Sequence, residues 1–310
     1  MKLPIALLSI ILLSCSPSKK QENSSDKPLI VCTTGIISDV VKNIVGNEAE
    51  VQSIMGPGVD PHLYKATHGD LVKFQEADLI IYNGLHLEGK MGEVLEKLGR
   101  KKAVIAFSDG LDPSLLINNT DFQGAYDPHI WFDVALWNQA LAEVTQKLIT
   151  ELDLSADSLN KHYQIYRQKL DSLDKAVGEA IESIPLDQRK LVTAHDAFGY
   201  YGKAYGIEVK GLQGISTLSE FGLKDVSSLV DYIVEHRIPS IYTETSVSEK
   251  SIEAVLVGVK AKGFDVSLGG SLYSDALGPS QTYEGTYIGM VDTNTKKIVQ
   301  GLKIDLNKEQ

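Results

Sequence analysis

The stretch LNKHYQIYRQKLDSLDKAVGEAIESI, residues 159–184, is the longest uninterrupted helical pattern in the chain. Its apolar side chains recur at intervals of three and four, and no proline follows before Pro185. This spacing is typical of an amphipathic helix, and about 28 residues would span roughly 42 Å, longer than one small domain. We therefore predict that residues 156–184 form one rigid helix linking two lobes. A coiled-coil arm and a surface helix within one lobe are the alternatives.

Short apolar runs alternate with helix-like segments on both sides of this stretch. The strand-like runs lie at 29–34, 51–55, 78–82 and 103–107 before it, and at 191–193, 207–210, 240–243 and 265–268 after it. Such alternation is typical of an α/β protein with mainly parallel sheets. We predict an N-terminal α/β lobe at 29–155 and a C-terminal α/β lobe at 185–310. Ligands of open α/β sheets bind at the carboxyl ends of strands, here in the cleft between the lobes.

The length and composition of the chain agree with two globular lobes, and its net charge argues against nucleic acid as a partner. A chain of 310 residues is too long for one ordinary core. Its 43% hydrophobic and 23% charged residues describe an ordinary globular protein. A net charge of -11 makes nucleic acid a poor partner, because phosphate binding needs clustered Lys and Arg. The same charge suits a cationic solute.

The N-terminus has the pattern of a bacterial export signal. Lys2 precedes a short apolar run at residues 5–13, which is too short to span a bilayer. The ending Leu-Leu-Ser-Cys at residues 12–15 resembles a lipobox, which predicts a lipoprotein signal peptide at 1–14 and a lipidated Cys15. Acyl chains on Cys15 and a flexible tether at 15–28 would hold the protein on the extracytoplasmic face of the cell membrane. An ordinary secretory signal is the alternative.

The second cysteine, Cys32, has no predicted disulfide partner if Cys15 is lipidated. It lies inside the first strand-like run, so we expect a small core residue and not a metal ligand.

Two copies of one short motif, Asp-Pro-His-aliphatic-aromatic, occur at residues 60–64 and 127–131. Proline restricts the backbone and Asp favours a turn, so each imidazole should stand at a rigid strand-to-loop corner. A third histidine, His195, directly follows the strand-like run at 191–193. We therefore predict that His62, His129 and His195 are metal ligands. The aspartates of the two motifs are expected to form the turns, or to accept hydrogen bonds that orient the rings.

A carboxylate is expected to complete the site, and spacing leaves two candidates. Asp275 lies in the loop after the last strand-like run, and Glu244 ends the run at 240–243. Three imidazoles with one carboxylate suit zinc and tolerate manganese, whereas calcium and magnesium prefer oxygen ligands throughout. The four remaining histidines have loop or polar-face contexts and are expected not to be ligands: His68, His86, His162 and His236.

Six motifs together resemble one family over residues 29–302, the zinc- and manganese-binding lipoproteins of bacterial ABC importers (cluster A-I, family 9 type). They are Asp-Pro-His-Leu-Tyr (60–64), Tyr-Asn-Gly-Leu-His-Leu-Glu (82–88), Asp-Pro-His-Ile-Trp-Phe-Asp (127–133), Thr-Ala-His-Asp-Ala-Phe-Gly-Tyr-Tyr (193–201), Val-Lys-Gly-Leu-Gln-Gly-Ile-Ser (209–216) and Tyr-Ser-Asp-Ala-Leu-Gly (273–278).

The resemblance implies two α/β lobes joined by a long helix, with metal held between them. It places the ligands on His62, His129, His195 and Asp275, and so favours Asp275 over Glu244. The third position varies between His and Glu in the family, and His195 points toward zinc or toward both metals. Many zinc-dedicated members carry a His-rich loop before the second ligand, but residues 109–126 contain no histidine. The resemblance therefore leaves zinc and manganese open.

The predicted function is high-affinity capture of Zn²⁺ or Mn²⁺ outside the cytoplasm and delivery to an ABC-type permease. The chain is predicted to be a monomer and not an enzyme. Permease and ATPase are predicted to be separate chains, because this chain contains no Gly-x-x-x-x-Gly-Lys-Ser/Thr loop. Affinity is expected to fall as the imidazoles protonate, below roughly pH 6.5. The alternatives are an exported zinc-dependent hydrolase, although His-Glu-x-x-His is absent, and a surface adhesin.

Overall fold

The computed structural model describes residues 27–119 and 124–303. The predicted signal peptide and Cys15 lie outside the described residues. Within the described part of the chain, no helix is long and apolar enough to cross a membrane.

The first lobe is built on a parallel sheet of four strands in the order β2-β1-β3-β4. Its strands are β1 (Leu29–Cys32), β2 (Glu50–Ser53), β3 (Leu79–Tyr82) and β4 (Ala103–Ala106), and its helices are α1 (Gly35–Val45), α2 (His68–Glu76) and α3 (Gly92–Gly99). Helices connect successive strands, as parallel pairing requires. Cys32 is fully buried in β1, which agrees with its expected place in the core.

The second lobe also contains parallel strands, paired as β5-β6 and β7-β8, with β5 lying beside β7. The strands are β5 (Lys190–His195), β6 (Glu208–Gln213), β7 (Ser240–Glu244) and β8 (Ser267–Leu272), and the helices are α6 (Gly199–Tyr205), α7 (Leu223–Glu235), α8 (Lys250–Ala261) and α9 (Tyr287–Leu302). The predicted α/β class with mainly parallel sheets is confirmed. Three short 3₁₀ turns, η1 (Pro113–Leu115), η2 (Ile130–Phe132) and η3 (Leu186–Gln188), lie in the connections.

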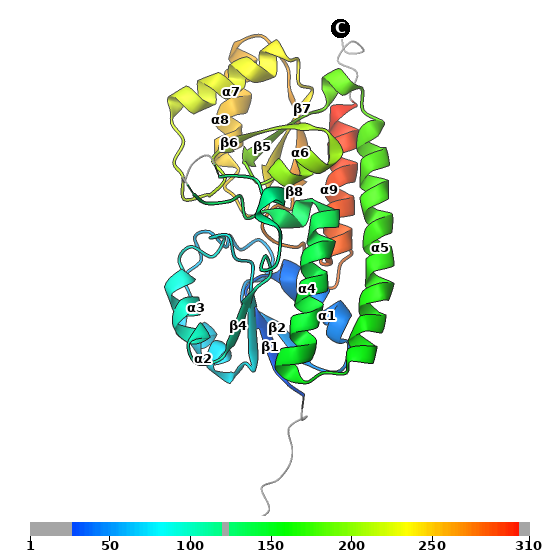
Figure 1. Ribbon diagram of the computed structural model, residues 1–310. Coiled ribbons are helices and arrows are strands. Elements are labelled where there is room, and N and C mark those ends of the chain that lie inside the picture. Colours follow the sequence, from blue (N-terminus) through cyan, green and yellow to red (C-terminus); the bar gives the residue numbers. More distant parts are fainter. Residues whose placement is uncertain (1–26, 120–123, 304–310) are drawn as a thin grey trace, which may run out of the picture.

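Two long helices, α4 (Val134–Leu152) and α5 (Ala156–Glu182), lie between the lobes in sequence. Helix α5 packs on α1 of the first lobe, on α4, and on α9 of the second lobe, and Figure 1 shows it running beside both lobes. The predicted linking helix is therefore confirmed, and the coiled-coil arm is wrong. The helix ends at Glu182 because Pro185 cannot continue the backbone ladder. The lobe boundaries at 155 and 185 stay a prediction.

One continuous apolar cluster extends through both lobes. It contains Ile30 of β1 in the first lobe and Tyr242 of β7 in the second, together with Trp137 of α4 and Tyr166 of α5. Close-packed side chains resist sliding, so this shared core restricts how far the lobes can separate. The lobes are thus joined by packing as well as by the chain.

Candidate metal centre

The four predicted ligands come from four separate loops and strand ends and meet in the interior. His62 lies in the loop between β2 and α2, His129 precedes η2, His195 is the last residue of β5, and Asp275 lies in the loop after β8. One potential ligand atom of each residue lies within 4.8 Å of the others. None of the four side chains is more than 1% exposed. The structure therefore brings together all four residues that the sequence singled out.

The spacing of these atoms matches the coordination shell of one small cation. The Nε2 atoms of His62 and His129 are 3.3 Å apart, and Nε2 of His129 is 3.3 Å from Oδ1 of Asp275. Four ligands at a Zn–N distance of about 2.05 Å would form a tetrahedron with edges of roughly 3.3 Å. Nε2 of His195 lies 3.5 Å from the other Asp275 oxygen. Several of these distances are therefore close to those between zinc ligands, within a set of atoms that lie no more than 4.8 Å apart.

Two of the potential metal-ligand atoms lack a hydrogen-bond partner within the described part of the chain. They are Nε2 of His195 and Oδ1 of Asp275, both fully buried. Buried polar atoms are nearly always paired, and contact with a bound ion is one recognised reason for an exception. These two atoms point to a cation as their missing partner.

The repeated Asp-Pro-His motif has the same local geometry in both copies. The Asp60 carboxylate accepts the backbone N–H of His62 at 2.8 Å, and that of Asp127 accepts the N–H of His129 at 2.9 Å. Asp127 also lies 2.7 Å from Nδ1 of His129, so it orients that ring as well as the turn. The expected turn role of both aspartates agrees with these bonds.

The surroundings of His129 differ from the expected strand end. No named strand leads directly into this residue: Tyr126 forms only an isolated bridge to Asn118, and His129 is the N-cap residue of η2. The prediction of a strand-to-loop corner is therefore wrong for His129, and it is wrong for His62 too, which lies in a turn well beyond the end of β2 at Ser53. The turn is held by Asn83 at the end of β3, whose side-chain amide donates to the carbonyl of Pro128 at 3.0 Å. Tertiary contacts replace the missing strand.

Glu244, the rival carboxylate, binds His195 on the Nδ1 side of its ring. It accepts the backbone N–H of His195 at 2.8 Å and also bonds Nδ1 of the same ring. This leaves Nε2 of His195 facing Asp275. Sequence reasoning missed one further contact, the Ser246 hydroxyl that donates to Oδ2 of Asp275 at 3.0 Å. No local pattern marks a serine in a loop after a strand, so no sequence signal was available.

Comparison with known proteins agrees with this arrangement. The family model described as "Zinc-uptake complex component A periplasmic" matches residues 30–301. The chain belongs to this family. The match covers nearly all the described residues, including both lobes and all four clustered side chains.

Two curated relatives of this chain have different metals in their names. The zinc-binding protein TroA of Treponema pallidum is 46% identical over 283 residues, 91% of each chain. The manganese-binding lipoprotein MntA of Bacillus subtilis is 44% identical over 299 residues, 96% of this chain and 97% of the relative. A solved structure of TroA matches with a TM-score of 0.85, covering 89% of this chain and 99% of that one.

The charges of the four clustered side chains are strongly coupled. Burial disfavours the His129 imidazolium, but Asp127 and Asp275 outweigh burial and raise the pKa of His129 to about 9. Glu244 and Asp275 similarly raise the pKa of His195 well above its usual range despite its burial. Burial lowers the pKa of His62 to about 3, and the charges of His129 and His195 add to this effect. His195 and His129 hold the pKa of Asp275 well below its usual range although burial opposes ionisation.

Metal binding at neutral pH should therefore release protons. The raised pKa values favour the imidazolium forms of His129 and His195 at pH 7 in the metal-free site. Metal binding must then displace one proton from each ring, about two protons per metal. Zinc affinity should still rise with pH above 7, because the pKa of His129 is raised to about 9 and that of His195 lies well above its usual range, so the fall begins at higher pH than the sequence suggests. Calorimetry in buffers of different ionisation enthalpy measures the proton count. A count near zero would contradict the charge assignment, and a His86→Ala variant should leave the count unchanged.

The remaining described histidines lie outside the cluster. Nδ1 of His162 is 2.9 Å from the carbonyl oxygen of Ile44. The His236 ring packs against the Tyr232 ring, with 4.4 Å between the ring centroids. His68 is exposed at the start of α2, and His86 is exposed in the loop after β3. Their positions agree with the expectation that none is a ligand.

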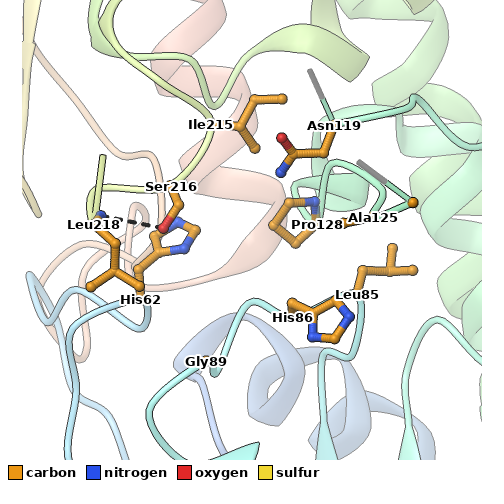
Figure 2. Close-up of a pocket in the computed structure, with 11 residues that line it drawn as sticks. His62, Leu85, His86, Gly89, Asn119, Ala125, Pro128, Ile215, Ser216 and Leu218 are labelled. Atoms are coloured by element: carbon orange, nitrogen blue, oxygen red, sulfur yellow. Dashed lines mark hydrogen bonds between the residues drawn. The ribbon is translucent and has the colours of Figure 1, made fainter. Parts of the chain in front are cut away.

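A cavity of about 380 Å³ reaches the cluster from one side. Figure 2 shows His62 at this cavity, with His86 from the first lobe and Ser216 from the second. Its lining comes from both lobes, so the cavity follows the cleft between them. A small ion could approach His62 by this route.

Proposed function

We propose that this chain binds one divalent transition metal ion, zinc or manganese, outside the cytoplasm and delivers it to an ABC-type permease. The single observation that carries the proposal is the buried set of three imidazoles and one carboxylate at the spacing of a metal's ligands. His62, His129, His195 and Asp275 are the proposed ligands. The names of the relatives support the same solute class, since TroA is called zinc-binding and MntA manganese-binding.

Under this proposal the site binds zinc more tightly than manganese. Nitrogen-rich sites bind zinc more strongly than manganese in the usual order of divalent metals. The native metal then depends on availability as well as affinity. Metal analysis of the protein purified from its own envelope, followed by zinc and manganese competition, tests the assignment. Absence of stoichiometric metal in every preparation and after reloading would overturn it.

Binding and not catalysis is proposed as the role of the site. Four protein ligands complete a tetrahedral shell, whereas catalytic zinc usually keeps one position open for water. The whole ligand set comes from one chain, which supports a monomer as the working unit. Permease and ATPase would be separate chains. A third relative supports this: PsaA of Streptococcus pneumoniae, 29% identical over 297 residues, is named as the substrate-binding lipoprotein of a manganese ABC transporter.

A lipid anchor on Cys15 is the proposed link to the membrane. The Leu-Leu-Ser-Cys sequence at residues 12–15 supports it, and MntA and PsaA are called lipoproteins. We expect Cys15→Ala to move most of the protein from the membrane fraction to the soluble extracytoplasmic fraction, because the acyl chains would be lost. Fractionation and immunoblotting measure this, with Cys32→Ala as the control. Unchanged membrane association would argue against the anchor.

A further inference from the structure

A segment of the second lobe, residues 214–222 between β6 and α7, forms one wall of the cavity above His62. Ile215, Ser216 and Leu218 line this cavity together with His62 (Figure 2). Between them, Thr217 is only 9% exposed, and its hydroxyl donates to Oδ2 of Asp60 in the first lobe at 2.7 Å. This hydrogen bond crosses from one lobe to the other.

The two carboxylate oxygens of Asp60 accept hydrogen bonds from different lobes. Oδ1 accepts the backbone N–H of His62 at 2.8 Å, and Oδ2 accepts the hydroxyl of Thr217. Hydrogen bonds to an ionised carboxylate are stronger than those between neutral groups. The turn that presents His62 is therefore tied to the opposite lobe through one side chain.

The other end of the connection lies beside His195. The side-chain amide of Gln213 donates to the carbonyls of Thr217 at 2.7 Å and Ser219 at 2.6 Å, which fixes the segment to the end of β6. Gln213 is the β6 residue that pairs with His195 of β5. A continuous path thus runs from His195 through Gln213, Thr217 and Asp60 to His62.

We propose that Thr217 is a positioning residue whose bond to Asp60 holds the two lobes closed over the metal and sets the rate of metal release. The inference rests on the proposed metal-binding function. Thr217 is not a ligand, and its hydroxyl reaches Asp60 only while the two loops are together. Loss of the bond therefore favours opening, which speeds release more than it changes association.

The test compares Thr217→Val, which removes the hydroxyl at nearly constant shape, with Thr217→Ser, which keeps it. Zinc-loaded mature protein is mixed with excess EDTA, and release is followed by stopped flow; association is measured separately with zinc. Thr217→Val should release zinc roughly tenfold faster, as expected for one lost hydrogen bond to a charged group. Association should stay within about twofold of the parent, and Thr217→Ser should release zinc at nearly the parent rate.

Thr150→Val is the matched control, because the Thr150 hydroxyl bonds only carbonyls of its own helix, α4, away from the cleft. If Thr217→Val does not fold, Gln213→Leu removes the anchor of the same segment and carries the same expectation. Parent-like release from a folded variant overturns the role of Thr217 while metal binding stands. A parent protein that binds no zinc overturns both proposals.

Discussion

A chain in which His129 is replaced by alanine should bind zinc about a hundred to a thousand times more weakly than the parent and still fold. Structural zinc sites with four ligands are worth about 10–16 kcal/mol, so one ligand accounts for roughly 2.5–4 kcal/mol. Nε2 of His129 lies 3.3 Å from Nε2 of His62 and 3.3 Å from Oδ1 of Asp275. Replacing His129 therefore removes a ligand atom that lies beside two others. Competition with a chromogenic chelator measures the affinity.

His236→Ala is the matched control for this experiment, because His236 is exposed and packs against Tyr232 outside the cluster. Thermal unfolding of both metal-free variants shows whether the fold survives. Full zinc affinity in a folded His129→Ala protein would rule out the proposed ligand set.

Replacing Asp275 with alanine should have a comparable effect for a different reason. Asp275 is the anionic member of the proposed set, and it offers one oxygen toward His129 and the other toward His195. Its removal takes away both a donor atom and the charge that favours a cation. We expect zinc affinity to fall by at least about a hundredfold, measured by the same competition. The exposed Asp265→Ala provides the matched control.

The Asp275→Ala variant also distinguishes a metal-transport protein from a zinc-dependent hydrolase. If Asp275 acted as a general base, its loss would leave zinc affinity unchanged and abolish an activity toward a hydrolysable substrate. Asp275→Asn adds a second measurement, since it keeps the shape and removes the charge that raises the pKa of His129 and His195. Zinc binding to that variant should release fewer protons.

The regular elements could be predicted because their signals are local. Apolar residues spaced three and four apart predicted α5, and Pro185 marked the region where it ends. Thr67 and Asp70 have the spacing of a capping box, and both of its hydrogen bonds are present at the start of α2. Each of these features depends on neighbours within one or two turns.

The clustered residues were predicted from a local motif and a family resemblance together. The Asp-Pro-His turns depend on contacts between residues two apart, so the sequence alone indicates them. The setting of His129 was predicted wrongly because its turn is held by Asn83, which lies far away along the chain. Local patterns carry no information about such a contact.

The sequence by itself determined the α/β alternation, the long helix, and the two turns that present His62 and His129. Only the tertiary structure placed Glu244, the last residue of β7, on the Nδ1 side of His195 and Asp275, in the loop after β8, on the Nε2 side. It likewise joined Thr217 to Asp60 across the cleft. The physical reason is that periodicity and turn propensity act between near neighbours. Which side of a ring a distant carboxylate meets depends on how β7 packs beside β5 and how the two lobes close.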